Sequence, residues 1–276
     1  MTMTQRKECT FPPLGGWALI VGASRGFGAA TALALAKAGV DIIGVHLDRR
    51  AGMPAVDRLK SAIRETGREA WFFNMNAADE RKRYLLIREI QRRFEERGNN
   101  DKIRVLLHSL AFGSLKDYIN SDLEGLVNQK DLDMTMDVMA HSLLYWVQDV
   151  LRADLFDDDG RIFAMTSEGS RVVWQGYGAV SAAKCALESH VRQLARELAP
   201  RGITANCIMA GVTDTPAARK IPAYDSMVRS ALAKNPRGRL TQPEDVASSI
   251  VALSQPCTYW MTGNVISVDG GETHCG

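Results

Sequence analysis

The chain has 276 residues, of which 46% are hydrophobic and 24% are charged, and its formal net charge is +2. This length suits one α/β domain with a sizeable core, and the scattered, nearly balanced charges argue against a nucleic-acid partner. No apolar run approaches the roughly 18 residues of a membrane span, so a membrane partner is not expected either.

The N-terminal segment 1–13 is polar and lacks the apolar stretch of a signal peptide, so we expect a loose arm there. The five cysteines are widely spaced and include no CxxC pair, which argues against a disulfide framework and a zinc site. We therefore expect no metal. Cysteines without disulfide bonds suit the reducing cytoplasm, so we expect a cytoplasmic location.

Short β-rich runs alternate with helical stretches along the rest of the chain, which is typical of a parallel sheet covered on both faces. Strands are expected at 17–21, 41–46, 69–74, 105–109, 160–166, 204–208 and 264–268. Helices are expected at 26–38, 55–65, 79–97, 131–151 and 177–198, and another begins at 243. With neither a repeat nor a linker, the chain (1–276) is expected to be a single α/β domain, with a Rossmann-type doubly wound sheet of about seven strands.

A glycine-rich turn, GASRGFG at 22–28, joins the first expected strand to the first expected helix. Such a turn lets the backbone approach a pyrophosphate, which the free N–H groups and the dipole of the helix N-terminus then bind. The alternative is an ordinary turn, but the strand before it and the helix after it favour dinucleotide binding. The candidate cofactor contacts in the turn are Gly22, Ser24, Arg25, Gly26, Phe27 and Gly28.

Tyr177 and Lys184 are seven residues apart on one expected helix. Seven residues are close to two helical turns, so both side chains share a face. An ammonium group favours the phenolate and lowers the cost of moving its proton. This pair therefore predicts proton chemistry, with Lys184 lowering the pKa of Tyr177. Ser167, which follows an expected strand, either binds substrate or caps a turn.

The glycine turn, the Tyr/Lys helix and the ending GNVISVDGG at 263–271 together resemble the short-chain dehydrogenase/reductase superfamily, over about 15–271. Within it, HSLAFG at 108–113 and the Tyr-x6-Lys spacing resemble divergent enoyl-acyl-carrier-protein reductases. Ketone-reducing relatives place tyrosine four residues before lysine, where this chain has Val180, and asparagine where it has Met139. The second tyrosine of many enoyl reductases is missing here.

The spacing has a chemical reason in this family. A ketone carries its oxygen on the carbon that accepts hydride, whereas an enoyl thioester accepts hydride two carbons from the carbonyl oxygen on which charge builds. The donor to that oxygen must therefore stand further along the helix.

The resemblance also implies which residues contact the cofactor and the substrate. Arg25 and Arg49 suit the 2′-phosphate of NADPH, whereas Asp48 suits NADH, so NADPH is favoured and NADH stays open. Phe112 and Tyr177 are the implied substrate contacts. The implied cofactor contacts beyond the glycine turn are His46, Arg49, Asn76, Ala77, Ser109, Leu110, Ala111, Lys184, Gly211, Val212 and Thr215.

The resemblance implies NAD(P)H-dependent reduction of the trans-2 double bond of an enoyl thioester, carried by acyl carrier protein or coenzyme A, in a homotetramer. Tyr177 would donate to the forming enolate, and Lys184 would bind the nicotinamide ribose. Two alternatives are a carbonyl reductase acting on a 3-oxoacyl thioester or a hydroxysteroid, and a non-catalytic dinucleotide sensor. The segment 216–235 is either a mobile lid over an acyl chain or a plain surface helix.

Overall fold

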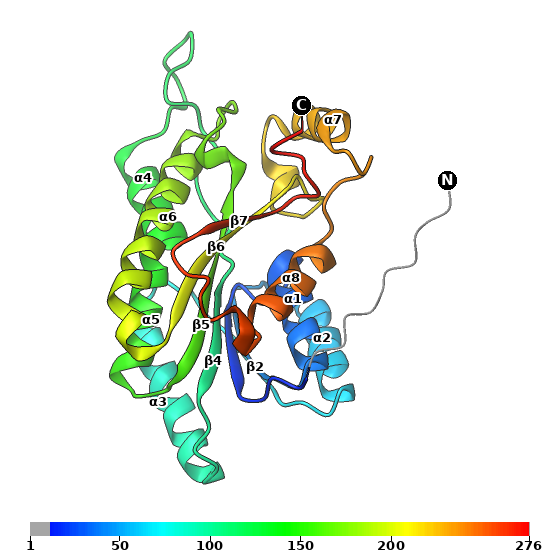
Figure 1. Cartoon of the computed structure of the whole chain (residues 1–276). Coiled ribbons are helices and arrows are strands. Elements are labelled where there is room, and N and C mark those ends of the chain that lie inside the picture. The colour runs from blue at the N-terminus through cyan, green and yellow to red at the C-terminus, as the bar shows by residue number, and fades with distance from the viewer. Residues whose placement is uncertain (1–11, 276) are drawn as a thin grey trace.

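The computed structural model of the chain describes residues 12–275, so the expected N-terminal arm lies almost entirely outside the described residues. Seven parallel strands form one sheet in the order β3-β2-β1-β4-β5-β6-β7 (Figure 1). The chain order reverses between β1 and β4, and ligands of such sheets bind beyond the carboxyl ends of the strands at this switch point. The strands are β1 Trp17–Val21, β2 Asp41–His46, β3 Ala70–Asn74, β4 Ile103–His108, β5 Phe156–Ser167, β6 Thr204–Ala210 and β7 Val265–Val268.

Helices cover both faces of the sheet, which confirms the predicted doubly wound architecture (Figure 1). One face carries α1 Gly26–Lys37, α2 Met53–Glu65 and α8 Pro243–Leu253. The other carries α3 Glu80–Arg97, α4 Gln129–Met136, α5 Ser142–Arg152 and α6 Gly178–Leu198. Helix α7 Tyr224–Lys234 lies beyond the strand ends (Figure 1). Short 3-10 turns are η1 Arg50–Gly52, η3 Glu168–Ser170, η4 Ala199–Arg201, η5 Ala218–Lys220 and η6 Pro256–Thr258.

The apolar strand sequences follow from burial on both faces of the sheet. Trp17 and Leu19 of β1 pack with α3, α5 and α6, whereas Ala18 and Ile20, which point the opposite way, pack with α1 and α8. Two apolar cores, one on each face, therefore hold the carboxyl ends of the strands in fixed positions. None of the helices within 12–275 is both long and apolar enough to cross a membrane.

The helix expected over 131–151 is divided, because a π-helix, η2 Asp137–His141, separates α4 from α5. At this point the Ser142 hydroxyl donates to the carbonyl oxygen of Val138 at 2.7 Å. Such side-chain bonds compete with the helical backbone pattern, and π-turns are frequent at functional sites. The π-helix presents Met139 to the cavity described below.

Candidate active site

A cavity of about 260 Å³ opens beyond the carboxyl ends of β4, β5 and β6. The loop after β4, the end of β5, the start of α6, the segment after β6 and α7 all contribute to its wall. The structure thus brings together residues that are far apart in the sequence. The predicted residues that line the cavity are Phe27, Ser109, Leu110, Ala111, Phe112, Ser167, Tyr177, Lys184, Gly211, Val212 and Thr215.

The other predicted residues lie at the ends of β1, β2 and β3, beside the cavity and not in its wall. Asn76 caps the turn after β3, where its side-chain oxygen accepts from the N–H of Ala78 at 3.1 Å. The carbonyl of Ala77 accepts from Trp146 Nε1 at 3.0 Å, so Ala77 ties β3 to α5. The predicted residues of this group are Gly22, Ser24, Arg25, Gly26, Gly28, His46, Arg49, Asn76 and Ala77.

The glycine turn fits a pyrophosphate. A Cβ on Gly28 would lie 2.0 Å from the carbonyl oxygen of Gly22, and one on Gly22, which has φ +98°, would lie 2.4 Å from that of Ser109. Only glycine therefore lets the turn pack this closely. Helix α1 begins there with no side-chain cap and no acidic residue in its first turn, so its N–H groups remain for an anionic ligand.

Asp48 organises the end of β2. Its carboxylate accepts from Arg25 Nη2 at 2.5 Å and lies 3.0 Å from His46 Nδ1. Asn74 fixes the Asp48 backbone through two hydrogen bonds of 3.0 and 2.8 Å. Burial alone would raise the pKa of Asp48, but hydrogen bonds from Ser24 and His46 and the charge of Arg25 hold it below its ordinary value. The Arg25 charge that was predicted to meet a 2′-phosphate is therefore balanced by a carboxylate.

Three consecutive residues at the end of β5 each bind one side chain of the α6 segment. The carbonyl of Met165 accepts from Lys184 Nζ at 2.7 Å, and the hydroxyl of Thr166 donates to Glu188 Oε1 at 2.7 Å. Ser167 Oγ accepts from Tyr177 OH at 3.3 Å. This register places the phenol and the ammonium along the same wall of the cavity.

Of the two roles that the sequence left open for Ser167, the structure shows the turn cap, and substrate binding stays a prediction. Its hydroxyl oxygen accepts from the Gly169 N–H at 3.1 Å, which caps the turn, and it also contacts the Tyr177 hydroxyl. A Cβ on Gly169 would lie 2.3 Å from Tyr177 Cε1, so the absence of a side chain there makes room for the phenol ring. Tyr177 itself stands at the N-cap position, one residue before α6.

The charges of the pair are set by burial. Desolvation lowers the pKa of Lys184 to about 8, although the neighbouring Cys207 and Glu188 oppose this. Burial raises the pKa of Tyr177, and only the hydrogen bond with Ser167 opposes the rise. The expectation that Lys184 lowers the pKa of Tyr177 is therefore wrong, because desolvation of the phenolate dominates. Tyr177 is a protonated donor near neutral pH.

His108 is structural. It is completely buried, and burial together with the charge of Lys184 lowers its pKa to about 3. Its Nε2 lies 2.7 Å from Ser142 Oγ. Since that hydroxyl already donates to Val138, Nε2 carries the proton and donates. His108 therefore ties β4 to the start of α5.

Several cavity residues were missed from the sequence because they lie in loops without periodicity. Val180 and Met139, which stand where ketone-reducing relatives carry polar groups, face the cavity and make it more apolar. The missed residues include Leu115 and Trp174.

The segment 216–235 folds over the cavity. It contains η5 and α7, and Ile221, Tyr224 and Met227 line the cavity. Asp214 anchors it by accepting from Arg219 Nε and Nη2, both at 2.6 Å, and from Tyr224 OH at 2.9 Å. These contacts favour a cover for the cavity over a plain surface helix.

Glu272, which the sequence did not indicate, contacts the segment after β6 at Val212. Its Oε1 accepts from the N–H of Val212 at 3.1 Å, and its Oε2 is buried without a hydrogen-bond partner. Burial raises the pKa of this carboxyl, against the hydrogen bond from the Val212 backbone. The end of the chain thus fixes the backbone of a predicted cofactor contact.

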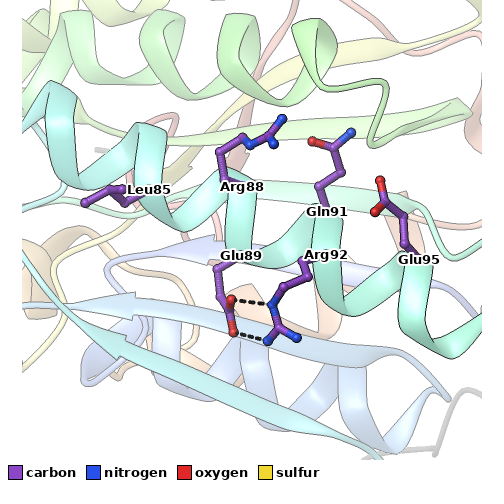
Figure 2. Close-up of a pocket in the computed structure, with 6 residues that line it drawn as sticks. All are labelled: Leu85, Arg88, Glu89, Gln91, Arg92 and Glu95. Atoms are coloured by element: carbon purple, nitrogen blue, oxygen red, sulfur yellow. Dashed lines mark hydrogen bonds and ion pairs between the residues drawn. The ribbon is translucent and has the colours of Figure 1, made fainter.

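A second hollow lies on the outer surface of α3, lined by Leu85, Arg88, Glu89, Gln91, Arg92 and Glu95 (Figure 2). Glu89 accepts from Arg92 at 2.9 and 2.8 Å and from Arg93 at 2.7 Å. Glu96 also accepts from Arg92, so two carboxylates balance two guanidinium groups. In residues 12–275 no group of three or more His, Cys, Asp or Glu side chains could hold a metal. The cavity at the strand ends is therefore the candidate active site.

A dinucleotide fits the glycine turn at the switch point of the sheet, and the adjoining wall carries a buried phenol and ammonium. These features define the class of nicotinamide-dinucleotide-dependent oxidoreductases.

The family model described as "Enoyl-(Acyl carrier protein) reductase" matches residues 22–273, and the chain belongs to this family of short-chain dehydrogenases/reductases. A cyclohexanol dehydrogenase of Rhodococcus sp. (strain TK6) is 30% identical over 95% of this chain and 98% of its own length. An NADH-dependent enoyl-acyl-carrier-protein reductase of Aquifex aeolicus is 28% identical over 67% of each chain. The solved structure of the angucycline C-6 ketoreductase LanV with bound NADP is similar with a TM-score of 0.80, at 26% identity over 95% of this chain and 97% of its own.

Proposed function

We propose that the protein reduces the trans-2 double bond of an enoyl thioester, with hydride from a nicotinamide cofactor. The supporting observation is the position of Tyr177, seven residues before Lys184, on the cavity wall beside Ser167. Val180, which stands four residues before Lys184, lines the same cavity and has no proton to give. A donor at this offset suits an oxygen remote from the carbon that accepts hydride.

The residues would act as follows. The bound nicotinamide supplies hydride to the β-carbon of the thioester. Tyr177, protonated near neutral pH, donates a hydrogen bond to the carbonyl oxygen as negative charge builds there. A proton from Tyr177 or water then reaches the α-carbon, which balances the reduction. Lys184 holds the nicotinamide ribose with the N–H groups that Met165 does not use, and its charge favours the developing anion.

Carbonyl reduction is the second candidate, and it has an observation in its favour. The hydroxyls of Ser167 and Tyr177 are 3.3 Å apart, so both can donate to one ketone oxygen. Cyclohexanol dehydrogenase and the LanV ketoreductase are among the similar proteins. A non-catalytic sensor is a weaker candidate, since the buried phenol of Tyr177 in the cavity serves no purpose in cofactor binding alone.

NADPH is the proposed cofactor. The side chain of Arg25 is half exposed while that of Asp48 beneath it is buried, so the guanidinium can meet a 2′-phosphate from the open side. The ionised Asp48 opposes this preference by its charge. We further propose, by analogy with the family, an acyl carrier protein or coenzyme A as the thioester carrier and a cytoplasmic homotetramer.

The test is a panel of crotonyl and acetoacetyl thioesters, each on coenzyme A and on acyl carrier protein, with NADPH or NADH. We expect NADPH consumption with crotonyl thioester and little with acetoacetyl thioester. Turnover of acetoacetyl thioester alone would replace the proposal by the carbonyl reductase. Cofactor binding without any turnover in this panel and a ketone panel would favour the sensor.

A further inference from the structure

We propose that Glu188, held by Thr166, is a positioning residue that keeps Lys184 charged inside the dry wall of the active site. Glu188 stands one helical turn after Lys184, and both side chains belong to the buried face of α6. Glu188 itself does not line the cavity. It therefore acts through Lys184 and does not touch substrate.

The carboxylate of Glu188 is buried and hydrogen-bonded. Its residue is 8% exposed, and Oε1 accepts a 2.7 Å hydrogen bond from the Thr166 hydroxyl. A buried carboxylate is costly unless it is hydrogen-bonded or compensated by a nearby positive charge. Thr166 supplies the hydrogen bond, and Lys184 is the buried cation on the same helix face.

The one hydrogen bond of Lys184 does not balance its positive charge, so Lys184 needs a nearby anion. Its residue is 4% exposed, and the bond from Nζ to the carbonyl of Met165 leaves the ammonium charge unbalanced. A desolvated ammonium loses its proton more easily than an exposed one. If Lys184 were neutral, it would lose its electrostatic effect on the reaction and one of its N–H donors.

The other titratable groups around Lys184 cannot supply this charge near neutral pH. On β4, His108 is neutral because its pKa is lowered to about 3. On β6, burial raises the pKa of the Cys207 thiol to about 12, so this neighbour is uncharged as well. On α6, Tyr177 is protonated and Arg192 is a cation that acts on Cys207. Cys207 and then Glu188 are the neighbours that oppose the lowering of the Lys184 pKa. Because the thiol of Cys207 is uncharged near neutral pH, Glu188 is the anion of the two.

The strand register supports the same assignment. The contacts of Met165, Thr166 and Ser167 fix Lys184, Glu188 and Tyr177 in turn. Glu188 is thus held by the same strand end as the two groups proposed to bind cofactor and substrate. The inference rests on the proposed role of Lys184 in binding the nicotinamide ribose.

The experiment compares Glu188→Gln with Glu197→Gln, an exposed glutamate on the same helix that contacts Gln193. NADPH affinity by fluorescence titration and kcat are both measured from pH 6 to pH 10. In Glu188→Gln the alkaline fall of both quantities should move to lower pH. A decrease of one unit in the Lys184 pKa would weaken NADPH binding about tenfold above the wild-type pKa and leave it nearly unchanged at pH 6. Glu197→Gln should follow the wild-type profile.

Two further variants complete the test. In Thr166→Val the alkaline fall of NADPH affinity and kcat should move in the same direction but less, because the carboxylate stays and only its hydrogen bond is lost. Glu188→Asp keeps the charge and should show most of the wild-type pH profile. If the pH dependence of NADPH affinity and kcat in Glu188→Gln has the same midpoint as in wild type, and kcat is lower by the same factor at every pH, Glu188 has only a packing role. If Glu188→Gln does not fold, an unshifted profile in Thr166→Val overturns the inference.

Lys184→Met separates this inference from the proposed function. Unchanged NADPH affinity in Lys184→Met would remove the ribose role of Lys184. Weakened affinity in Lys184→Met, together with an unshifted profile in Glu188→Gln, would defeat the role of Glu188 alone.

Discussion

Tyr177 carries the largest share of the proposed chemistry at the scale of single residues. In Tyr177→Phe we expect kcat to fall about 10²-fold or more, the size of effect seen when an oxyanion donor is removed. NADPH affinity should stay nearly intact, because the phenol hydroxyl contacts Ser167, is proposed to meet the reacting oxygen, and lies apart from the glycine turn. Steady-state kinetics and fluorescence titration measure the two quantities.

Tyr84→Phe is the matched control, since Tyr84 is an exposed tyrosine on α3. It should leave both quantities at wild-type values. A Tyr177→Phe enzyme that retains turnover within a factor of about three would exclude the phenol as the oxyanion donor.

Glu272 allows a residue-scale prediction on stability. Its pKa is raised by burial, so its contribution to stability is present below its unfolded pKa and is lost as the pH rises through the folded value. A glutamine side chain at this position would keep the acceptor for the Val212 N–H and remove the buried charge. Glu272→Gln should therefore raise the melting temperature at pH 7.5 by about 1–3 °C, and by less at pH 5.

Differential scanning fluorimetry at the two pH values checks this, with Glu95→Gln on the exposed face of α3 as the control. Equal increases in melting temperature at both pH values would mean that burial does not raise the pKa of the Glu272 carboxyl. A lower melting temperature at pH 7.5 would mean that its charge stabilises the fold.

At the scale of elements, the glycine turn and α1 depend on each other. A Cβ on Gly28 would meet the Gly22 carbonyl oxygen at 2.0 Å, so Gly28→Ala must push the turn out of shape. We expect a loss of about 1–3 kcal/mol in the free energy of unfolding and NADPH binding weakened at least about tenfold, because the N-terminus of α1 moves away from the pyrophosphate.

Urea unfolding and NADPH titration measure the two effects. Gly98→Asn is the control: Gly98 ends α3 at φ +65° with open space around it, a conformation that asparagine tolerates. Wild-type NADPH affinity in Gly28→Ala would show that the turn does not hold the cofactor.

Elements with a strong local pattern could be predicted from the sequence. The apolar run Trp17–Val21, the glycines at 22–28 and the seven-residue offset of Tyr177 from Lys184 are all local, and the fold arranges them as expected. What could not be predicted depends on contacts between distant segments. The π-helix depends on a bond from Ser142 to Val138, and the Glu272–Val212 bond joins positions 60 residues apart.

The same limit explains the electrostatics. From the sequence, an ammonium beside a phenol predicts a lowered tyrosine pKa, but burial of Tyr177 has the opposite and larger effect. Likewise Arg25 carries a free charge in the sequence, whereas the fold pairs it with Asp48 across 23 positions. Spacing along a helix or strand shows which groups can meet. Burial and contacts with groups from distant segments then decide whether they are charged.

At the scale of the whole molecule, cofactor preference should appear as a difference in thermal stability. A ligand that binds only the folded state at about 100 times its Kd adds about 2.7 kcal/mol, which in a domain of this size corresponds to roughly 5–10 °C. If Arg25 binds the 2′-phosphate that NADH lacks, as proposed, NADPH should raise the melting temperature more than NADH at equal concentrations. Melting curves with each nucleotide measure this.

Arg25→Ala should remove most of the difference between the two nucleotides by reducing the NADPH shift and sparing the NADH shift. It also leaves the Asp48 carboxylate without its guanidinium partner, which further disfavours a phosphate and leaves a ribose diol unaffected. Arg64→Ala, on the exposed surface of α2, should change neither shift. Equal losses for the two nucleotides in Arg25→Ala would mean that Arg25 supports the turn itself, and NADPH selection would then have to come from another residue.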